Sequence, residues 1–142
     1  MSGWLLGPEA FAEFVSGRKP GVTNPVLDWA DKLRETLYVS EMTWAEVRSQ
    51  AQQLTSPRER EAWLRVLDEQ VPSEFGPRLL PLQRVHLARW SELRLEKSPS
   101  GKRLSPVEAF DAAVCLAEGL GYVTRSDYLG RFTAQPTHNP WI

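Results

Sequence analysis

Four acidic residues are placed where a parallel α/β sheet could bring carboxylates together. Glu46 is expected in the first turn of a helix that follows a strand, and Glu108 in the first turn of a later helix. Asp111 lies one helical turn beyond Glu108, and Asp127 lies in the loop after another expected strand. Mg²⁺ and similar hard cations take oxygen ligands of this kind. The residue types therefore indicate a metal site if the two helix starts face one crevice.

The same two glutamates also fit a structural role. Ser or Thr is followed three residues later by Glu at three places, Thr43/Glu46, Ser56/Glu59 and Ser105/Glu108. In such a capping box the hydroxyl and the carboxylate accept hydrogen bonds from backbone N–H groups that have no partner at the start of the helix. One of the three pairs occurs where no site is expected, so the spacing alone favours caps over ligands. On this interpretation Glu46→Ala removes a cap and costs about 1 kcal/mol of stability.

A basic segment of the chain could hold a nucleic acid. Residues 76–103 carry seven basic and two acidic side chains, although the whole chain has a net charge of −1. Charge-assisted contacts from such a segment can hold a phosphate backbone. The candidates for this role are Arg84, Arg89, Lys102 and Arg103. The alternative is an exposed helix and its loop, whose arginines are solvated or paired locally.

Strands and helices alternate along the chain. The expected strands are 3–6, 36–40, 78–80 and 121–124. The expected helices are 9–16, 25–34, 82–96, 105–119 and two more that begin at Thr43 and Ser56, followed by an irregular tail at 135–142. This alternation predicts a parallel sheet covered by helices on both faces. Sites in such sheets lie beyond the C-terminal strand ends, so we expect one after Leu6, Ser40 and Val123.

The composition fits one globular domain over residues 1–142. Hydrophobic residues make up 42% and charged residues 25%, which is typical of a folded chain. No apolar run approaches the roughly 18 residues of a membrane helix, and the start lacks the features of a secretory signal, so we expect a cytoplasmic protein. The single cysteine, Cys115, excludes an internal disulfide and a multi-cysteine zinc site. No nucleotide-binding loop, zinc-protease motif or serine-hydrolase motif is present.

A series of short motifs, in order along nearly the whole chain, resembles PIN-domain proteins of the VapC and FitB toxin type. The matching segments are Leu5–Glu9, Tyr38–Val47, Arg78–Leu82, Ala88–Arg94, Val123–Arg125 and Asn139–Trp141. The resemblance implies an αβα sandwich that forms a homodimer. It also implies Mg²⁺- or Mn²⁺-dependent cleavage of RNA, and a cognate antitoxin that occludes the site. In the active family, four acidic positions at the strand ends bind the metal.

This chain departs from that pattern at two of the four acidic positions. Gly7 stands at the first of them, and Ser126 stands at the fourth. Glu46 and Glu108 match the second and third positions, and they are the candidate catalytic and metal-binding residues. Three further carboxylates could compensate as metal ligands, namely Glu9, Asp111 and Asp127.

Two functional hypotheses follow from the resemblance and its departures. In the first, the metal site is degraded and nuclease activity is lost or strongly reduced, while dimerisation and binding of an antitoxin-like partner remain. In the alternative, the chain is an active Mg²⁺- or Mn²⁺-dependent endoribonuclease that uses a shifted carboxylate cluster. The residues favour the first hypothesis because Gly7 cannot ligate a metal. A carboxylate misplaced by about 1 Å can also lower a rate by two orders of magnitude.

Overall fold

The computed structural model describes residues 2–97, 101–126, 129–133 and 135–142, without the side chains of residues 131 and 133. The strands are β1 (Trp4–Leu6), β2 (Leu37–Ser40), β3 (Leu79–Leu80), β4 (Gly121–Val123) and β5 (Thr137–His138). The α-helices are α1 (Pro8–Ser16), α2 (Pro25–Ala30), α3 (Glu41–Gln52), α4 (Pro57–Arg65), α5 (Val71–Phe75), α6 (Arg84–Leu93), α7 (Pro106–Glu118) and α8 (Gly130–Thr133). Two short 3₁₀ turns (Arg34–Thr36, Gly76–Arg78) and a π-helical turn (Val66–Gln70) complete the described elements.

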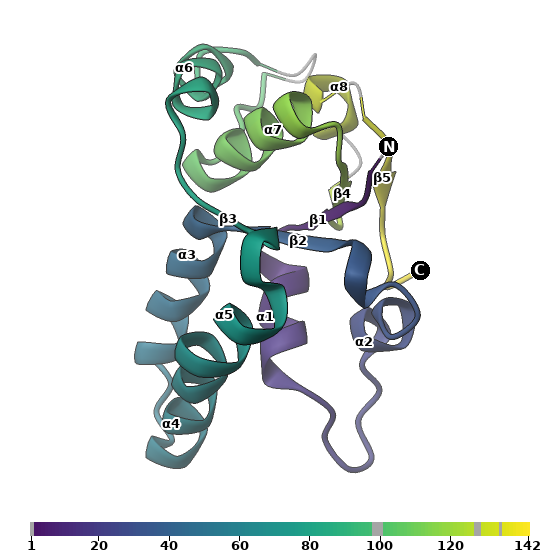
Figure 1. Ribbon diagram of the computed structural model, residues 1–142, viewed down its shortest axis with the longest axis vertical. Coiled ribbons are helices and arrows are strands. Elements are labelled where there is room, and N and C mark those ends of the chain that lie inside the picture. Colours follow the sequence, from purple (N-terminus) through teal and green to yellow (C-terminus); the bar gives the residue numbers. More distant parts are fainter. Residues whose placement is uncertain (1, 98–100, 127–128, 134) are drawn as a thin grey trace.

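All five strands are parallel, in the order β3-β2-β1-β4-β5. The first strand of the chain is therefore the central one, with β2 and β4 on its two sides. Figure 1 shows α6, α7 and α8 on one face of this sheet, and α1, α3, α4 and α5 on the other. The predicted αβα sandwich, a parallel sheet covered by helices on both faces, is confirmed.

Each face of the sheet has its own hydrophobic core. Successive side chains of a strand point to opposite faces. Accordingly, Leu6 packs with Phe11, Val47 and other residues of the N-terminal helices, whereas the neighbouring Leu5 packs with Phe110 and other residues of α7. Both leucines are fully buried. The short strand β1 thus holds the two helical layers together from the middle of the sheet.

The helix ends explain where the structure differs from the expected ranges. The helix expected over 25–34 ends at Ala30, because the following turns use i→i−3 bonds from Leu33 N–H to the Ala30 carbonyl and from Thr36 N–H to the Leu33 carbonyl. At the other end, Asn24 accepts a hydrogen bond from Leu27 N–H, as expected of an N-cap. The helix expected over 82–96 is also shorter, at Arg84–Leu93.

The C-terminal tail was expected to be irregular, but in the structure it adds the edge strand β5 to the sheet. The N–H groups of Tyr122 on β4 and of Thr124 just after it donate to the carbonyls of Pro136 and His138. A two-residue strand has no sequence periodicity of its own, so this pairing depends on the free edge of β4. Within the described part of the chain, no helix is both long and apolar enough to cross a membrane.

Candidate functional site

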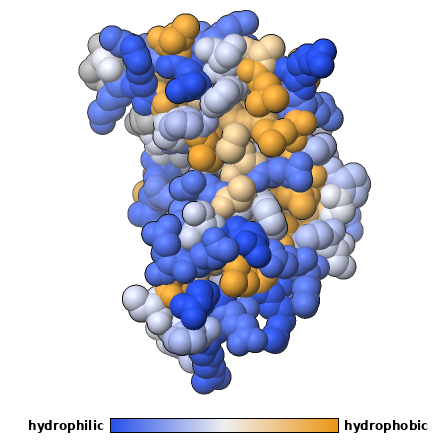
Figure 2. Space-filling model, turned by 90° about the vertical axis from the view of Figure 1, so that its left-hand side faces the viewer, coloured by the Kyte–Doolittle hydropathy of each residue, from blue (hydrophilic) through white to orange (hydrophobic). Residues whose placement is uncertain are grey.

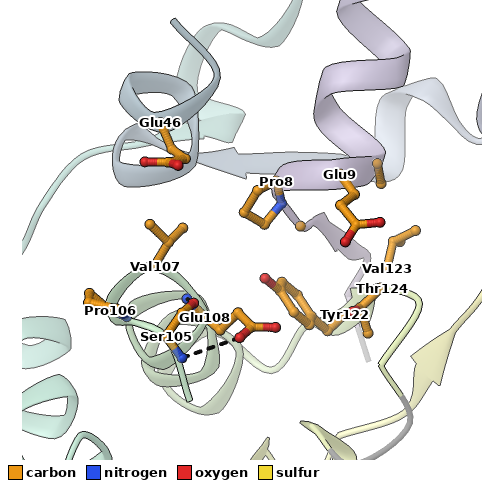
Figure 3. Close-up of a pocket in the computed structure, with 12 residues that line it drawn as sticks. Pro8, Glu9, Glu46, Ser105, Pro106, Val107, Glu108, Tyr122, Val123 and Thr124 are labelled. Atoms are coloured by element: carbon orange, nitrogen blue, oxygen red, sulfur yellow. Dashed lines mark hydrogen bonds between the residues drawn. The ribbon is translucent and has the colours of Figure 1, made fainter. Parts of the chain in front are cut away.

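A cavity of about 400 Å³ opens at the C-terminal ends of β1 and β4. The first turns of α1 and α7 form two of its walls, Glu46 of α3 lies at a third side, and Tyr122 and Val123 of β4 reach it from the sheet (Figure 3). The structure therefore has a cavity at the strand ends after Leu6 and Val123, as the alternation of elements predicts. The cavity is concave and largely apolar, with a few acidic side chains, as ligand sites often are.

Three of the predicted site residues come together around this cavity. Glu9, Glu46 and Glu108 all line it, and they arrive from α1, α3 and α7 respectively. Figure 3 shows them on different sides of the opening, with Pro8 and the ring of Tyr122 between them. Among the described residues, no three His, Cys, Asp or Glu side chains are grouped closely enough to hold a metal ion.

Glu46 does not cap its helix, which corrects the structural interpretation of the Thr43/Glu46 pair. Helix α3 begins at Glu41, and its N-cap is Ser40, whose hydroxyl accepts a hydrogen bond from Thr43 N–H at 3.1 Å. Glu46 therefore lies in the second turn with an exposed side chain. Within the described part of the chain, its carboxylate has no hydrogen bond or ion pair, and it remains available at the cavity.

Glu108, in contrast, does complete a capping box. Its carboxylate accepts from the Ser105 N–H at 3.3 Å, and the Ser105 hydroxyl accepts from the Glu108 N–H at 3.2 Å. The third pair is half formed. Ser56 accepts from Glu59 N–H, but the Glu59 carboxylate pairs with Lys19 instead. One oxygen of Glu108 is thus already committed to the start of α7.

Two of the three cavity glutamates, Glu46 and Glu108, should differ in their effect on stability when each is replaced by alanine. Glu108→Ala is expected to lower the free energy of unfolding by about 1 kcal/mol, because a cap is lost. Glu46→Ala is expected to change it by less than about 0.5 kcal/mol, because an exposed side chain without a partner is removed. Urea denaturation of both variants measures the difference. An equal loss for the two variants would contradict these assignments.

Glu9 is already paired with a cation. Its carboxylate lies 3.0 Å from Arg125 Nε. The guanidinium of Arg125 in turn lies 4.2 Å from the centre of the Trp141 ring, and the Trp141 indole donates to the Glu13 carboxylate. The C-terminal tail thereby fixes Arg125 beside the cavity. A metal ion would have to compete with this guanidinium for Glu9.

The backbone leaves no room for a side chain at position 7. A Cβ atom placed on Gly7 would lie 2.8 Å from the Val123 carbonyl oxygen and 2.9 Å from the Tyr122 hydroxyl oxygen. Gly7 has ordinary extended dihedral angles, so glycine is required here by close packing and not by backbone conformation. The position that the resemblance assigns to the first acidic residue therefore carries no side chain, and the neighbouring strand fills the space that one would need.

Asp111 does not line the cavity, although the sequence suggests it as a ligand. It is fully buried behind Tyr122 and accepts three hydrogen bonds, from Ser40 Oγ at 2.6 Å, Thr43 Oγ1 at 2.7 Å and Tyr122 Oη at 2.7 Å. Burial raises the pKa of this carboxyl from 3.8 to about 6, and the three hydroxyl donors oppose the rise. Burial and the nearby Asp111 carboxylate also raise the pKa of Tyr122 well above its usual value.

The other candidate residues are spread more widely. Asp127 lies outside the described residues. Of the basic candidates, Arg84 lies at the start of α6, and Lys102 and Arg103 lie just before α7; all three are exposed. Arg89 is paired with Glu92 and Glu96 of its own segment. The local pairing expected for the basic segment thus applies to Arg89.

Sequence reasoning missed Tyr122 as a site residue. It stands in a short apolar strand and gives no chemical signal there. Its contacts with Gly7 and Asp111 become visible only in the structure, where β1, β4 and α7 pack together. The signal in the sequence that comes closest to this contact is Gly7 itself, at a position where the resemblance leads us to expect aspartate.

Comparison with known proteins places this chain in a family. The model of the PIN domain matches residues 12–133. The plasmid stability protein StbB of Pseudomonas syringae pv. tomato is 30% identical over 119 residues, which cover 82% of this chain and 84% of StbB. The VapC ribonuclease Y4jK of Sinorhizobium fredii is 27% identical over 117 residues, with the same two coverages.

Solved structures agree with this assignment at the level of the fold. The crystal structure of FitAcB from Neisseria gonorrhoeae matches with a TM-score of 0.80 and 24% identity, over 97% of this chain and 98% of the matched one. A toxin-antitoxin complex from Klebsiella pneumoniae matches with a TM-score of 0.68 and 17% identity, over 97% and 98% of the two chains. The chain belongs to the PIN-domain family, and it is similar to members of the VapC and FitB type.

Proposed function

We propose that this chain is a PIN-domain protein of the toxin-antitoxin type in which metal-dependent nuclease activity is lost or strongly reduced. One observation carries the proposal. Position 7, where the family has its first aspartate, is a glycine whose side-chain space is taken by Tyr122 and Val123. The proposal treats residues 1–142 as one functional domain.

The remaining carboxylates make a poor ligand set for Mg²⁺ or Mn²⁺. Glu108 caps α7, Glu9 is paired with Arg125, and Asp111 is sealed behind Tyr122. Glu46 alone of these four has no partner in the described part of the chain. Hard divalent cations bind through several oxygen ligands with defined geometry, and one free carboxylate does not supply these. The residues present therefore do not fit the metal that the family implies.

An active endoribonuclease remains the second candidate, because Glu9, Glu46 and Glu108 line the same cavity. For these three to act together as metal ligands, Glu9 would have to exchange its exposed ion pair with Arg125 for the metal, and Glu108 would have to bind through its second oxygen while the first accepts from the Ser105 N–H. The three carboxylates would also have to move closer together than they lie among the described residues. Arg84, Arg89, Lys102 and Arg103 would be the residues that contact RNA under this hypothesis.

The part that we propose to remain is binding to other proteins. The related VapC ribonuclease and the toxin-antitoxin complex with the same fold support an antitoxin-like partner, and the resemblance to the family supports a homodimer. Leu82, Val85 and Leu87 beside and on α6 are exposed. Figure 2 shows apolar side chains gathered on the upper part of the face that carries this helix. Exposed apolar groups of this kind are typical of surfaces that bind other proteins.

Titration of the purified protein with Mn²⁺ by calorimetry tests the proposal without any knowledge of a substrate. We expect no binding heat up to millimolar Mn²⁺ and no change in the melting temperature, because only a ligand that binds the folded state stabilises it. Glu108→Ala and Glu59→Ala, a cavity glutamate and one remote from it, serve as the matched pair. Binding that is lost in Glu108→Ala and kept in Glu59→Ala would overturn the proposal in favour of the active nuclease.

A further inference from the structure

Tyr122 fills the place where the site would need a ligand. Its hydroxyl oxygen lies 2.9 Å, and its Cζ atom 3.1 Å, from the point where a Cβ of residue 7 would stand. Real Cβ atoms essentially never come within 3.0 Å of another heavy atom, so a side chain at position 7 and this phenol in its present place exclude each other. The Val123 carbonyl oxygen, at 2.8 Å, is a second obstacle. Tyr122 is 1% exposed, and its side chain reaches the edge of the cavity.

Hydrogen bonds hold the phenol in this orientation. Tyr122 Oη donates to Asp111 Oδ2, and the same carboxylate accepts from Ser40 and Thr43. Turning the phenol away would break a bond to a fully buried carboxylate, whose charge depends on its donors because water cannot reach it. The direction of the ring is therefore set from the buried side of the sheet.

The network also joins the elements that surround the cavity. The acceptor, Asp111, is on α7, and the three donors are on β4, at the end of β2 and in the first turn of α3. Converging carboxylates at strand ends need a positive charge to hold them together. Here a single buried carboxylate is balanced by three hydroxyl groups, so this part of the fold requires no cation.

From these contacts we infer that Tyr122, fixed by Asp111, is an internal block that keeps a divalent cation out of the strand-end site and replaces it as the link between α7 and the strands. The inference rests on the proposed function and names the residue responsible. Its consequence is that restoring the missing acid is not enough: Gly7→Asp alone does not create a metal site. A smaller residue at position 122 is required as well, so that β4 can shift and relieve the 2.8 Å contact of the Val123 carbonyl oxygen.

The test compares Gly7→Asp, Tyr122→Val and the double variant Gly7→Asp/Tyr122→Val, each checked for folding by circular dichroism. We expect Mn²⁺ to raise the melting temperature of the double variant by several degrees and to leave both single variants unchanged. Calorimetry with Mn²⁺ should show the same pattern. A Gly7→Asp variant that binds Mn²⁺ as tightly as the double variant overturns the inference, as does a folded double variant that does not respond to Mn²⁺.

A second measurement tests the block without any metal. Gly7→Ala adds the Cβ alone, and its loss of melting temperature is compared in the native background and in Tyr122→Phe, which lacks the hydroxyl oxygen. We expect a smaller loss in the Tyr122→Phe background, because the hydroxyl contact is removed while the contacts of the ring Cζ and the Val123 carbonyl stay. Equal losses in the two backgrounds would show that the Tyr122 hydroxyl does not occupy this space.

These outcomes are separate from those of the proposed function. Binding of Mn²⁺ by the native protein would refute the loss of the metal site, whatever the effect of Tyr122. If Gly7→Ala lowers the melting temperature equally with and without Tyr122→Phe, the role of Tyr122 as a block is refuted, even if the native protein binds no metal.

Discussion

Replacing Asp111 with alanine is expected to lower the free energy of unfolding by about 3 kcal/mol. The substitution leaves the hydroxyl groups of Ser40, Thr43 and Tyr122 without their shared acceptor in a fully buried place. A buried donor without a partner costs about 1–3 kcal/mol, and three of them that can partly reorient should together cost about this amount. Denaturation with urea, monitored by tryptophan fluorescence, gives the value directly.

Asp68→Ala is the matched control for this experiment. Asp68 also accepts hydrogen bonds, from Arg48, but both side chains are substantially exposed. The loss is expected to stay below about 1 kcal/mol, as for other surface ion pairs. If Asp111→Ala also lowers the free energy of unfolding by less than about 1 kcal/mol, the buried network contributes no more to stability than the exposed Arg48–Asp68 pair. The network would then have no role in linking α7 to the strands.

The stability of the native protein relative to Asp111→Asn is expected to change with pH. Burial raises the pKa of Asp111 from 3.8 to about 6 in the folded state, so between these values the folded protein keeps a proton that the unfolded chain releases. The stability contributed by this group is therefore highest below pH 4 and falls as the pH rises to about 6. This difference in pKa between the unfolded and folded states corresponds to a change of about 3 kcal/mol at most in the free energy of unfolding.

Chemical denaturation of the native protein and of Asp111→Asn, repeated between pH 4 and pH 8, isolates this contribution. Asp68→Asn is the control, because Arg48 lowers the pKa of Asp68 below 3.8 and the stability added by this pair is lost only as the pH falls below about 4. The difference in stability between the native protein and Asp68→Asn should therefore stay nearly constant between about pH 4 and pH 8, and it should be small because the pair is exposed. A difference between native protein and Asp111→Asn that does not vary with pH would contradict the burial argument.

Much of the fold could be predicted from the sequence because its signals are local. The proline at the first position of α1, α2 and α7, and the Ser105 cap, fix those helix starts through neighbouring residues. The two strands β1 and β2 also lie where their apolar runs predict them. The strand β5 could not be predicted, since two residues carry no periodicity and are ordered by the edge of β4.

The site was less predictable because it depends on contacts between distant residues. The Thr43/Glu46 spacing fits a capping box as well as Ser105/Glu108 does, and the difference is made by Ser40, which takes the cap of α3. The carboxylate of Asp111 and the hydroxyl of Ser40 are 71 residues apart in the sequence. No sequence pattern within α7 indicates that hydroxyl groups on other elements donate hydrogen bonds to a buried aspartate.

The central position of β1 has a consequence for synthesis of the chain. Its partner β2 follows within 40 residues, but β4 is made only after residue 120. The helices α1–α5 can therefore cover one face of the sheet while the chain is still on the ribosome, whereas Leu5 on the other face waits for Phe110 and its neighbours. Until then β1 has one unpaired edge and the sheet one bare apolar face, the features that chaperones bind and that drive aggregation of nascent chains.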